Sequence, residues 1–151
     1  YNTKGALWNM TEDVEFQING NTFKLSDYHL KVETYEIGIP EHKTEYFEIA
    51  FSNVVYDFTE YFGSVTYKQR PVTIQCQLMK STPCWQKIMD KIQNIMHGQL
   101  CTFRFVSDSE WYYTGRITVE PNEHEAWNYA TVSFSITCLP LKTNSEGVSK
   151  L

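Results

Sequence analysis

The feature that most constrains the fold is a strictly alternating segment, from Ala130 to Cys138, near the C-terminal end of the chain. Every second residue of this segment is apolar, and serine or threonine stands at each position between them. A β-strand places successive side chains on opposite faces, so one face of this segment would be apolar and the other polar. That division is typical of an antiparallel sheet with one covered face.

Further alternating segments cover much of the chain. Val14–Ile18 is followed at once by Asn19-Gly20, the preferred pair for a type I′ hairpin turn, so residues 21–25 are expected to be the return strand. Aromatic residues make up 15% of the chain, which also favours a sheet. The other expected strands are residues 30–34, 72–78, 101–105 and 111–119, with a further alternating set at Phe47, Ile49 and Phe51.

One helix is expected, over residues 83–97. Ser81 or Thr82 suits its N-terminal cap, Pro83 suits its first position, and Gly98 suits its C-terminal end. Between these ends apolar residues recur every three or four positions, as in a helix packed on a core: Trp85, Ile88, Met89, Ile92, Ile95 and Met96. A short helical turn is expected at residues 57–63, a turn at 107–110 and a polar loop at 120–128. The fold class is therefore mainly β (α+β), an antiparallel β-sandwich or barrel with one flanking helix.

Charge and hydropathy argue against several classes of function. Eighteen acidic and 13 basic residues give a net charge of −5, and no run of Lys or Arg indicates a surface for nucleic acid or anionic membrane. No apolar run reaches the length of a membrane span, and no signal-peptide core follows residues 1–4. Residues 143–151 are polar and are expected to be a frayed end or a linker.

The cysteines and histidines offer little chemistry. Cys76, Cys101 and Cys138 fall on the apolar phase of expected strands, which predicts reduced thiols in the core. No Cys/His spacing fits a zinc site, so no metal or cofactor is expected. Cys84-Trp85 is similar to the cysteine–tryptophan pair of papain-like proteases, but the Gly-rich context and the spacing to a downstream histidine are missing.

Two alternatives to a purely structural function stay open. The expected loop contains Glu120, Glu123, His124, Glu125 and Trp127, and paired carboxylates can hydrolyse glycosides. A solvated loop, or a loop that binds a sugar or a partner protein, fits these residues better. The alternatives are therefore a carbohydrate-binding β-sandwich and a small hydrolase that uses Cys84 or this loop.

Five motifs, in their order along the chain, resemble the N-terminal ring domain of siphophage distal tail proteins. They are Tyr67-Lys68-Gln69-Arg70, His97-Gly98 at the end of the helix, the acidic turn at Asp108, the aromatic strand that ends in Gly115-Arg116, and Cys138-Leu139-Pro140. The likeness covers residues 16–141. The chain departs from the family pattern at residues 52–55, which lack the usual glycine, and it ends where many members continue into a second domain.

The resemblance implies a tail-tube-like ring domain over residues 1–142, followed by the polar tail 143–151. Six copies would form a homo-oligomeric ring at the tail tip of the virion, with the tail tube protein on one face and the tail-associated lysin or baseplate hub on the other. It would serve host attachment, and DNA would pass through the lumen without specific binding. A ring of this kind needs two different contact patches on each subunit. The residues expected at the interface are Asn19, Gly20, Tyr67, Arg70, Trp111, Tyr113 and Arg116.

Overall fold

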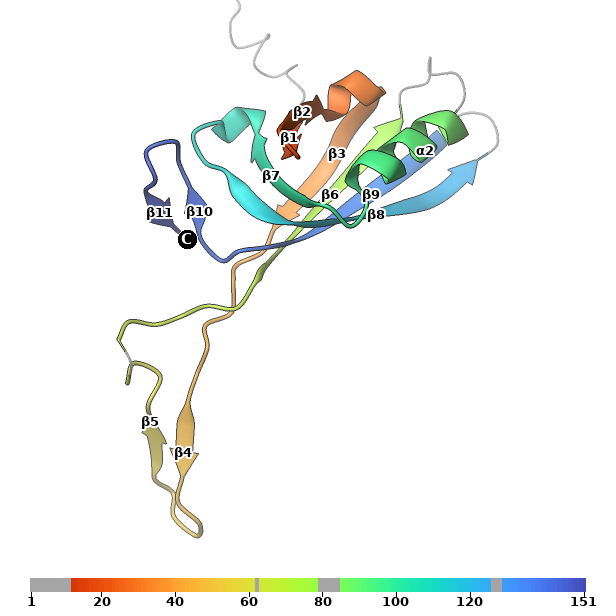
Figure 1. The fold of residues 1–151 in the computed structure, drawn as a ribbon. Coiled ribbons are helices and arrows are strands. Elements are labelled where there is room, and N and C mark those ends of the chain that lie inside the picture. Colours follow the sequence, from red (N-terminus) through yellow and green to blue (C-terminus); the bar gives the residue numbers. More distant parts are fainter. Residues whose placement is uncertain (1–11, 62, 79–84, 126–128) are drawn as a thin grey trace, which may run out of the picture.

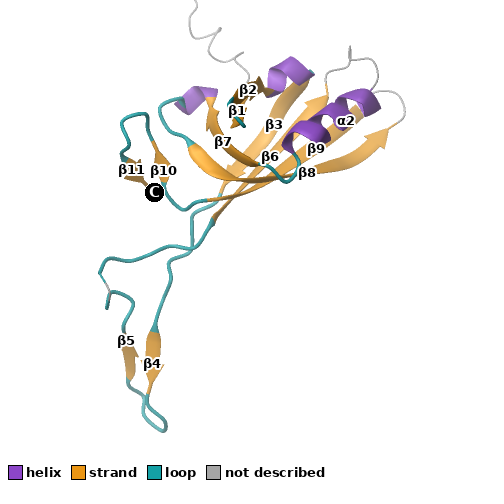
Figure 2. Ribbon diagram, in the orientation of Figure 1, coloured by secondary structure: helices purple, strands orange, loops and turns teal. Residues whose placement is uncertain are grey.

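A computed structural model describes residues 12–61, 63–78, 85–125 and 129–151. Its centre is one antiparallel sheet of seven strands in the order β2-β1-β7-β8-β9-β6-β3 (Figure 1). These strands are β1 Val14–Ile18, β2 Asn21–Lys24, β3 Leu30–Ile37, β6 Arg70–Leu78, β7 Leu100–Phe105, β8 Tyr113–Glu125 and β9 Tyr129–Cys138. Two short 3-10 helices, η1 Leu25–Tyr28 and η2 Val106–Asp108, follow β2 and β7. Two small hairpins, β4 Tyr46–Glu48 with β5 Val55–Asp57 and β10 Lys142–Thr143 with β11 Ser149–Lys150, lie outside this sheet (Figure 2).

The sheet curls over its own apolar face. Phe16 on β1 and Phe134 on β9 are three strand positions apart, roughly 14 Å in a flat sheet, yet their ring centroids are 6.1 Å apart. Tyr35 on β3 and Phe105 on β7 are four positions apart, and their ring centroids are 4.7 Å apart. One continuous sheet therefore supplies both layers around the core. The predicted fold class, mainly antiparallel β with one flanking helix, is confirmed.

The helix α2 Trp85–Met96 covers part of the same core. Met89, Ile92 and Met96 are fully buried in it, and the other three residues of the predicted stripe are half-buried against it. Gly98 has a φ of +77°, the left-handed conformation expected just after the end of a helix. The predicted cap and first-turn residues 81–84 lie outside the described residues.

The hairpin at the start of the chain also forms as predicted. Asn19 and Gly20 have φ values of 51° and 81°, and they join Ile18 to its cross-strand partner Asn21. The alternation of β3 is predicted less well, because the register with β6 shifts between Val32 and Thr34. Thr34 is therefore exposed rather than buried on the face of Val32.

Four local predictions are wrong. Residues 120–125 of the loop expected at 120–128 are strand instead, because β8 runs to Glu125 and a bulge between Pro121 and His124 keeps it paired with β9; residues 126–128 lie outside the described residues. The helical turn at 57–63 is a set of separate turns that follow β5. The alternating set at 47–51 forms strand only as far as Glu48, and Phe51 lies in the left-handed region with a φ of 60°. The polar end of the chain does not fray, since β10 and β11 pair and Tyr112 forms two backbone hydrogen bonds with Thr143.

Candidate functional site

A long arm leaves the curled body between β3 and β6. We define the arm as residues 39–69; it carries the β4–β5 hairpin and extends away from the sheet (Figure 1). Gly38 marks its base, where the backbone N–H of Gly38 donates to the Pro71 carbonyl at 2.8 Å. A Cβ at Gly38 would lie 2.7 Å from the Pro71 ring, so the chain can enter the arm along this path only with glycine.

The arm exposes most of its apolar side chains. Of the 17 large apolar residues that the described part of the chain exposes, ten lie in the arm: Ile39, Tyr46, Phe47, Ile49, Phe51, Val54, Val55, Tyr56, Phe58 and Tyr61. The described residues between Glu41 and Tyr61 include none that is buried. A two-stranded hairpin has little stability of its own in water, and a contiguous exposed apolar surface marks an interaction site. The arm is therefore the first candidate for the functional site.

The outer part of the arm is also acidic. Residues 44–67 include four acidic residues and no lysine or arginine. Asp57 accepts hydrogen bonds from the hydroxyl of Thr59 and, at 2.9 Å, from its backbone N–H. These two bonds lower the pKa of Asp57, the hydroxyl contributing most, so this carboxylate stays ionised at neutral pH.

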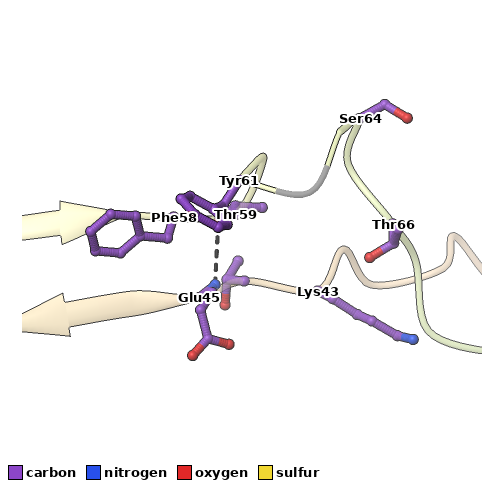
Figure 3. A pocket seen from close by; sticks show the side chains of 8 residues that line it. Lys43, Glu45, Phe58, Thr59, Tyr61, Ser64 and Thr66 are labelled. Carbon is purple, nitrogen blue, oxygen red and sulfur yellow. Dashed lines mark hydrogen bonds between the residues drawn. The ribbon is translucent and has the colours of Figure 1, made fainter.

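A pocket opens between the two sides of the arm near its middle (Figure 3). Its volume is about 770 Å³, and its lining combines two aromatic rings with hydroxyl groups and two charges: Lys43, Thr44, Glu45, Phe58, Thr59, Tyr61, Ser64 and Thr66. The backbone N–H of Glu45 donates to the Thr59 hydroxyl oxygen at 3.3 Å, and the Phe58 N–H donates to the Glu45 carbonyl at 2.7 Å. An open pocket with rings and hydroxyl groups can receive a side chain of a partner protein or a sugar ring.

Two predicted interface residues meet where the arm joins the body. Arg70 begins β6 directly after the arm, pairs with Cys138 on β9, and lies with its Cζ 5.7 Å from the centroid of the Tyr113 ring. Arg70 and Tyr113 are buried, at 5% and 4% exposure. Burial raises the pKa of Tyr113, the largest effect on it, while the charge of Arg70 lowers it. These two residues therefore contribute to the core beneath the arm and are poor choices for a test of an interface.

Trp111 lies beneath two cations at the C-terminal hairpin. Lys150 Nζ is 4.2 Å from the centroid of the Trp111 ring and Lys142 Nζ is 5.8 Å from it. Such cation–π contacts stabilise the position of an ammonium group over an indole. The face of Trp111 is thus occupied within the chain.

The remaining predicted residues have separate positions. Asn19 and Gly20 form the exposed turn between β1 and β2, and Tyr67 forms a single bridge with His42 in the arm. Arg116 donates to the Gly98 carbonyl at 2.7 Å, and the neighbouring His97 Nδ1 accepts from the Val119 N–H at 3.1 Å. The His97-Gly98 and Gly115-Arg116 motifs thus fasten the end of α2 to β8.

The sequence interpretation missed the apolar arm. It treated Phe47, Ile49 and Phe51 only as one more alternating set, and the structure exposes all three. One signal was present: Val54, Val55 and Tyr56 are apolar at consecutive positions. Such a run places apolar side chains on both faces of a short strand. A strand at the surface of a folded body has only one face against the core, so it needs apolar side chains on that face alone.

The three described cysteines have no features of a reactive site. Cys76, Cys101 and Cys138 are free thiols and buried, as predicted. Burial is the main cause that raises the pKa of each thiol, to about 12. A thiol in this state is neither a nucleophile nor a metal ligand near neutral pH.

These thiols are expected to react only when the chain unfolds. In a Cys84→Ser background, which leaves only the three described thiols, modification by a chromogenic disulfide reagent is expected to be roughly 100-fold or more slower in buffer than in urea. The measurement is the absorbance of the released thiolate over time. Rapid reaction of one thiol in the folded protein would contradict its position in the core.

Other kinds of site find no support in the described ranges. No group of three or more His, Cys, Asp or Glu side chains among the described residues could hold a metal ion. No described helix combines the length and the apolar character needed to cross a membrane. The side chains of residues 122–128, which the sequence grouped as a candidate acidic loop, lie outside the described side chains.

Comparison with known proteins gives a fold. No family model and no curated protein matches the chain. The structure is similar to the crystal structure of the Dit (gp 19.1) protein of phage SPP1, described as a paradigm of the hub adsorption apparatus in phages that infect Gram-positive bacteria, with a TM-score of 0.64. The chain has the fold of a distal tail protein. Sequence identity is 14%, and the match covers 87% of this chain but only 52% of the SPP1 protein, so the chain spans about half the length of that distal tail protein.

A second solved structure matches less closely. The baseplate of the anti-feeding prophage, solved by cryo-EM with sixfold symmetry applied, matches with a TM-score of 0.42 and 8% identity, over 86% of this chain and 89% of the other.

Proposed function

We propose that this chain is a non-enzymatic structural subunit of a phage tail tip. Copies of it would form a ring, with six subunits, between the tail tube protein and the tail-associated lysin or baseplate hub. The distal tail fold supports a position in the tail, and the exposed apolar arm is the observation that carries the proposal of assembly. In the virion this ring would contribute to host attachment and surround the path of the DNA.

The arm explains how such a subunit can associate with copies of itself. Ten of its apolar side chains stay exposed among the described residues, so their exposed surface gains the stability of burial only against another molecule. The rest of the subunit offers a different surface, and contact between two different surfaces of identical subunits is head-to-tail. Head-to-tail contacts close into rings when the rotation between subunits is suitable.

The test is the molar mass in solution, measured by light scattering over a range of protein concentrations. The intact chain is expected to form a species of about six times its 17.7 kDa subunit mass. A variant with residues 43–66 replaced by a short Gly-Ser linker is expected to stay monomeric at each concentration, with an unchanged circular dichroism signal of its β-sheet. An intact chain that stays monomeric at all concentrations, or an armless variant that still assembles, would contradict the proposal.

One observation favours the alternative of a carbohydrate-binding module. The pocket of the arm presents the Phe58 and Tyr61 rings beside several hydroxyl groups, which suits a sugar ring. In that case a glycan array is expected to give saturable binding that Tyr61→Ala abolishes, while Tyr35→Ala on the body leaves it unchanged. Binding to the intact chain without any assembly would favour this alternative over the ring.

A further inference from the structure

The C-terminal hairpin carries a pair of lysines in an unfavourable arrangement. Lys142 and Lys150 are directly opposite each other on β10 and β11. Like charges at opposite positions of an antiparallel pair repel each other. Among the described residues neither lysine forms an ion pair, because the ion pairs there join Lys68 to Glu41 and Arg104 to Glu15. Both ammonium groups lie on the side of the hairpin next to Trp111, and that of Lys142 is also 5.9 Å from the centroid of the Tyr113 ring. Lys142 is half-buried there and Lys150 is exposed.

The same hairpin is the second exposed apolar surface of the described chain. Seven of the exposed large apolar residues lie outside the arm, and four of these seven lie in the segment that carries the lysine pair: Leu139, Leu141, Val148 and Leu151. Of these, Val148 lies two residues before Lys150 and so shares the face of the lysines, whereas Leu141 and Leu151 are their immediate neighbours in the chain and point to the other face. We call residues 139–151 the lysine patch. The patch therefore combines apolar side chains with two positive charges, and Glu146 is its one acidic residue.

One face of the arm has the complementary composition. Tyr46 pairs with Asp57 and Glu48 pairs with Val55, and cross-strand partners point to the same face of a hairpin. This face therefore presents two carboxylates beside an aromatic ring and a branched apolar side chain. All four residues are exposed. The other face carries Phe47 and Tyr56, which are paired with each other.

The arm and the lysine patch of one subunit do not meet. The β4–β5 hairpin lies at the far end of the arm, and the β10–β11 hairpin lies beside the body (Figure 1). Complementary surfaces that are apart on one chain can meet only between two chains. Such a contact is head-to-tail and uses two different patches, as a closed ring requires.

We infer that the lysine patch is the surface on which the arm of a second copy of this chain docks, with Glu48 and Asp57 of the arm facing Lys142 and Lys150. This inference rests on the proposed function and names the two surfaces that would form its subunit contact. The carboxylates would relieve the repulsion between the two lysines. The apolar residues beside the charges, Val148 on the patch and Tyr46 and Val55 on the arm, would exclude water from the pairs. Opposite charges then set the register of the arm, and the apolar contacts supply most of the affinity.

Charge exchange tests the inference. Glu48→Lys and Lys150→Glu are each expected to weaken assembly at least 10-fold, measured as the protein concentration at half-dissociation in light scattering. The double variant Glu48→Lys/Lys150→Glu restores an opposite pair and is expected to return to within about threefold of the intact chain. Lys91→Glu, which changes the same charge on the exposed face of α2, is the matched control and is expected to leave assembly unchanged.

The outcomes separate this inference from the proposed function. Assembly of the intact chain with no effect of either single variant would overturn the docking of the arm on the lysine patch and leave the ring in place. The inference would also be overturned if the loss of assembly in the double variant equalled the sum of the losses in the two single variants. An intact chain that is monomeric at all concentrations would overturn both the ring and its contact. Added salt is expected to weaken the intact contact, because it screens exposed charges.

Discussion

Replacing Phe16 by alanine is expected to lower the free energy of unfolding of the body by about 4 kcal/mol, at the upper end of the range for large-to-small changes in a core. The Phe16 side chain is fully buried, and its ring lies 5.6 Å from that of Phe103 on the adjacent strand β7 and 6.1 Å from that of Phe134 on β9. It therefore fills the space that the curled sheet encloses. Urea denaturation followed by circular dichroism measures the change.

Phe47→Ala on the arm is the matched control for this substitution. Phe47 is 57% exposed, so its removal is expected to change the free energy of unfolding by less than about 0.5 kcal/mol at a concentration at which the chain is monomeric. At higher concentrations Phe47→Ala is expected to weaken assembly, whereas Phe16→Ala acts on folding. Equal stability losses for the two variants would contradict the assignment of Phe16 to the core and of Phe47 to the exposed surface of the arm.

The elements that the sequence predicts well are those fixed by local chemistry. The alternation of β9, the apolar stripe of α2, and the left-handed turn at Asn19 and Gly20 each depend on residues close together in the chain. The burial of Cys76, Cys101 and Cys138 follows from the same alternation. For such elements the period of the apolar residues and the conformational preference of a few residues are sufficient to predict the local structure.

The curl of the sheet could not be predicted in the same way. It brings Tyr35 to Phe105, which are far apart in sequence and on strands that do not pair. The extension of β8 past Pro121 was missed for a related reason. A proline followed by polar residues is typical of a loop, and only the pairing of His124 with Ala130 across the bulge shows that the strand continues.

Of the residues predicted at the interface only Tyr67 lies in the arm, and their role in an interface stays a prediction. The motifs around Arg70, Tyr113 and Cys138 do converge in space, but they do so inside the core. Apolar residues in a sequence are normally assigned to the core, because burial on the same chain is the commonest way to cover them. The arm is the exception, since its apolar residues lie on a hairpin whose length takes it beyond the body. Apart from the consecutive apolar residues at 54–56, only the tertiary structure shows that these side chains are exposed.

Gly115→Ala is expected to destabilise the body by about 3 kcal/mol or more, because the added methyl group has no room. A Cβ at Gly115 would lie 2.5 Å from the Thr137 carbonyl oxygen and 2.7 Å from the Cys138 Cα, both atoms of the β9 backbone. A neighbouring backbone cannot move aside as the end of a flexible side chain can. For a domain of this size the loss corresponds to a fall of roughly 10 °C in the melting temperature, which differential scanning calorimetry measures.

Thr118→Ala on the same strand is the control for Gly115→Ala. Thr118 is exposed and paired with Ser135, so its replacement is expected to change the melting temperature by less than about 2 °C. Gly115 occupies the middle of a row in which Cys101 on β7, Gly115 on β8 and Cys138 on β9 are cross-strand partners. The Gly-Arg motif would then be needed for two reasons. Gly115 allows the backbones of β8 and β9 to approach closely, and Arg116 donates a hydrogen bond to the Gly98 carbonyl just after α2. A stable Gly115→Ala protein would contradict the first reason and leave the second as the explanation of the motif.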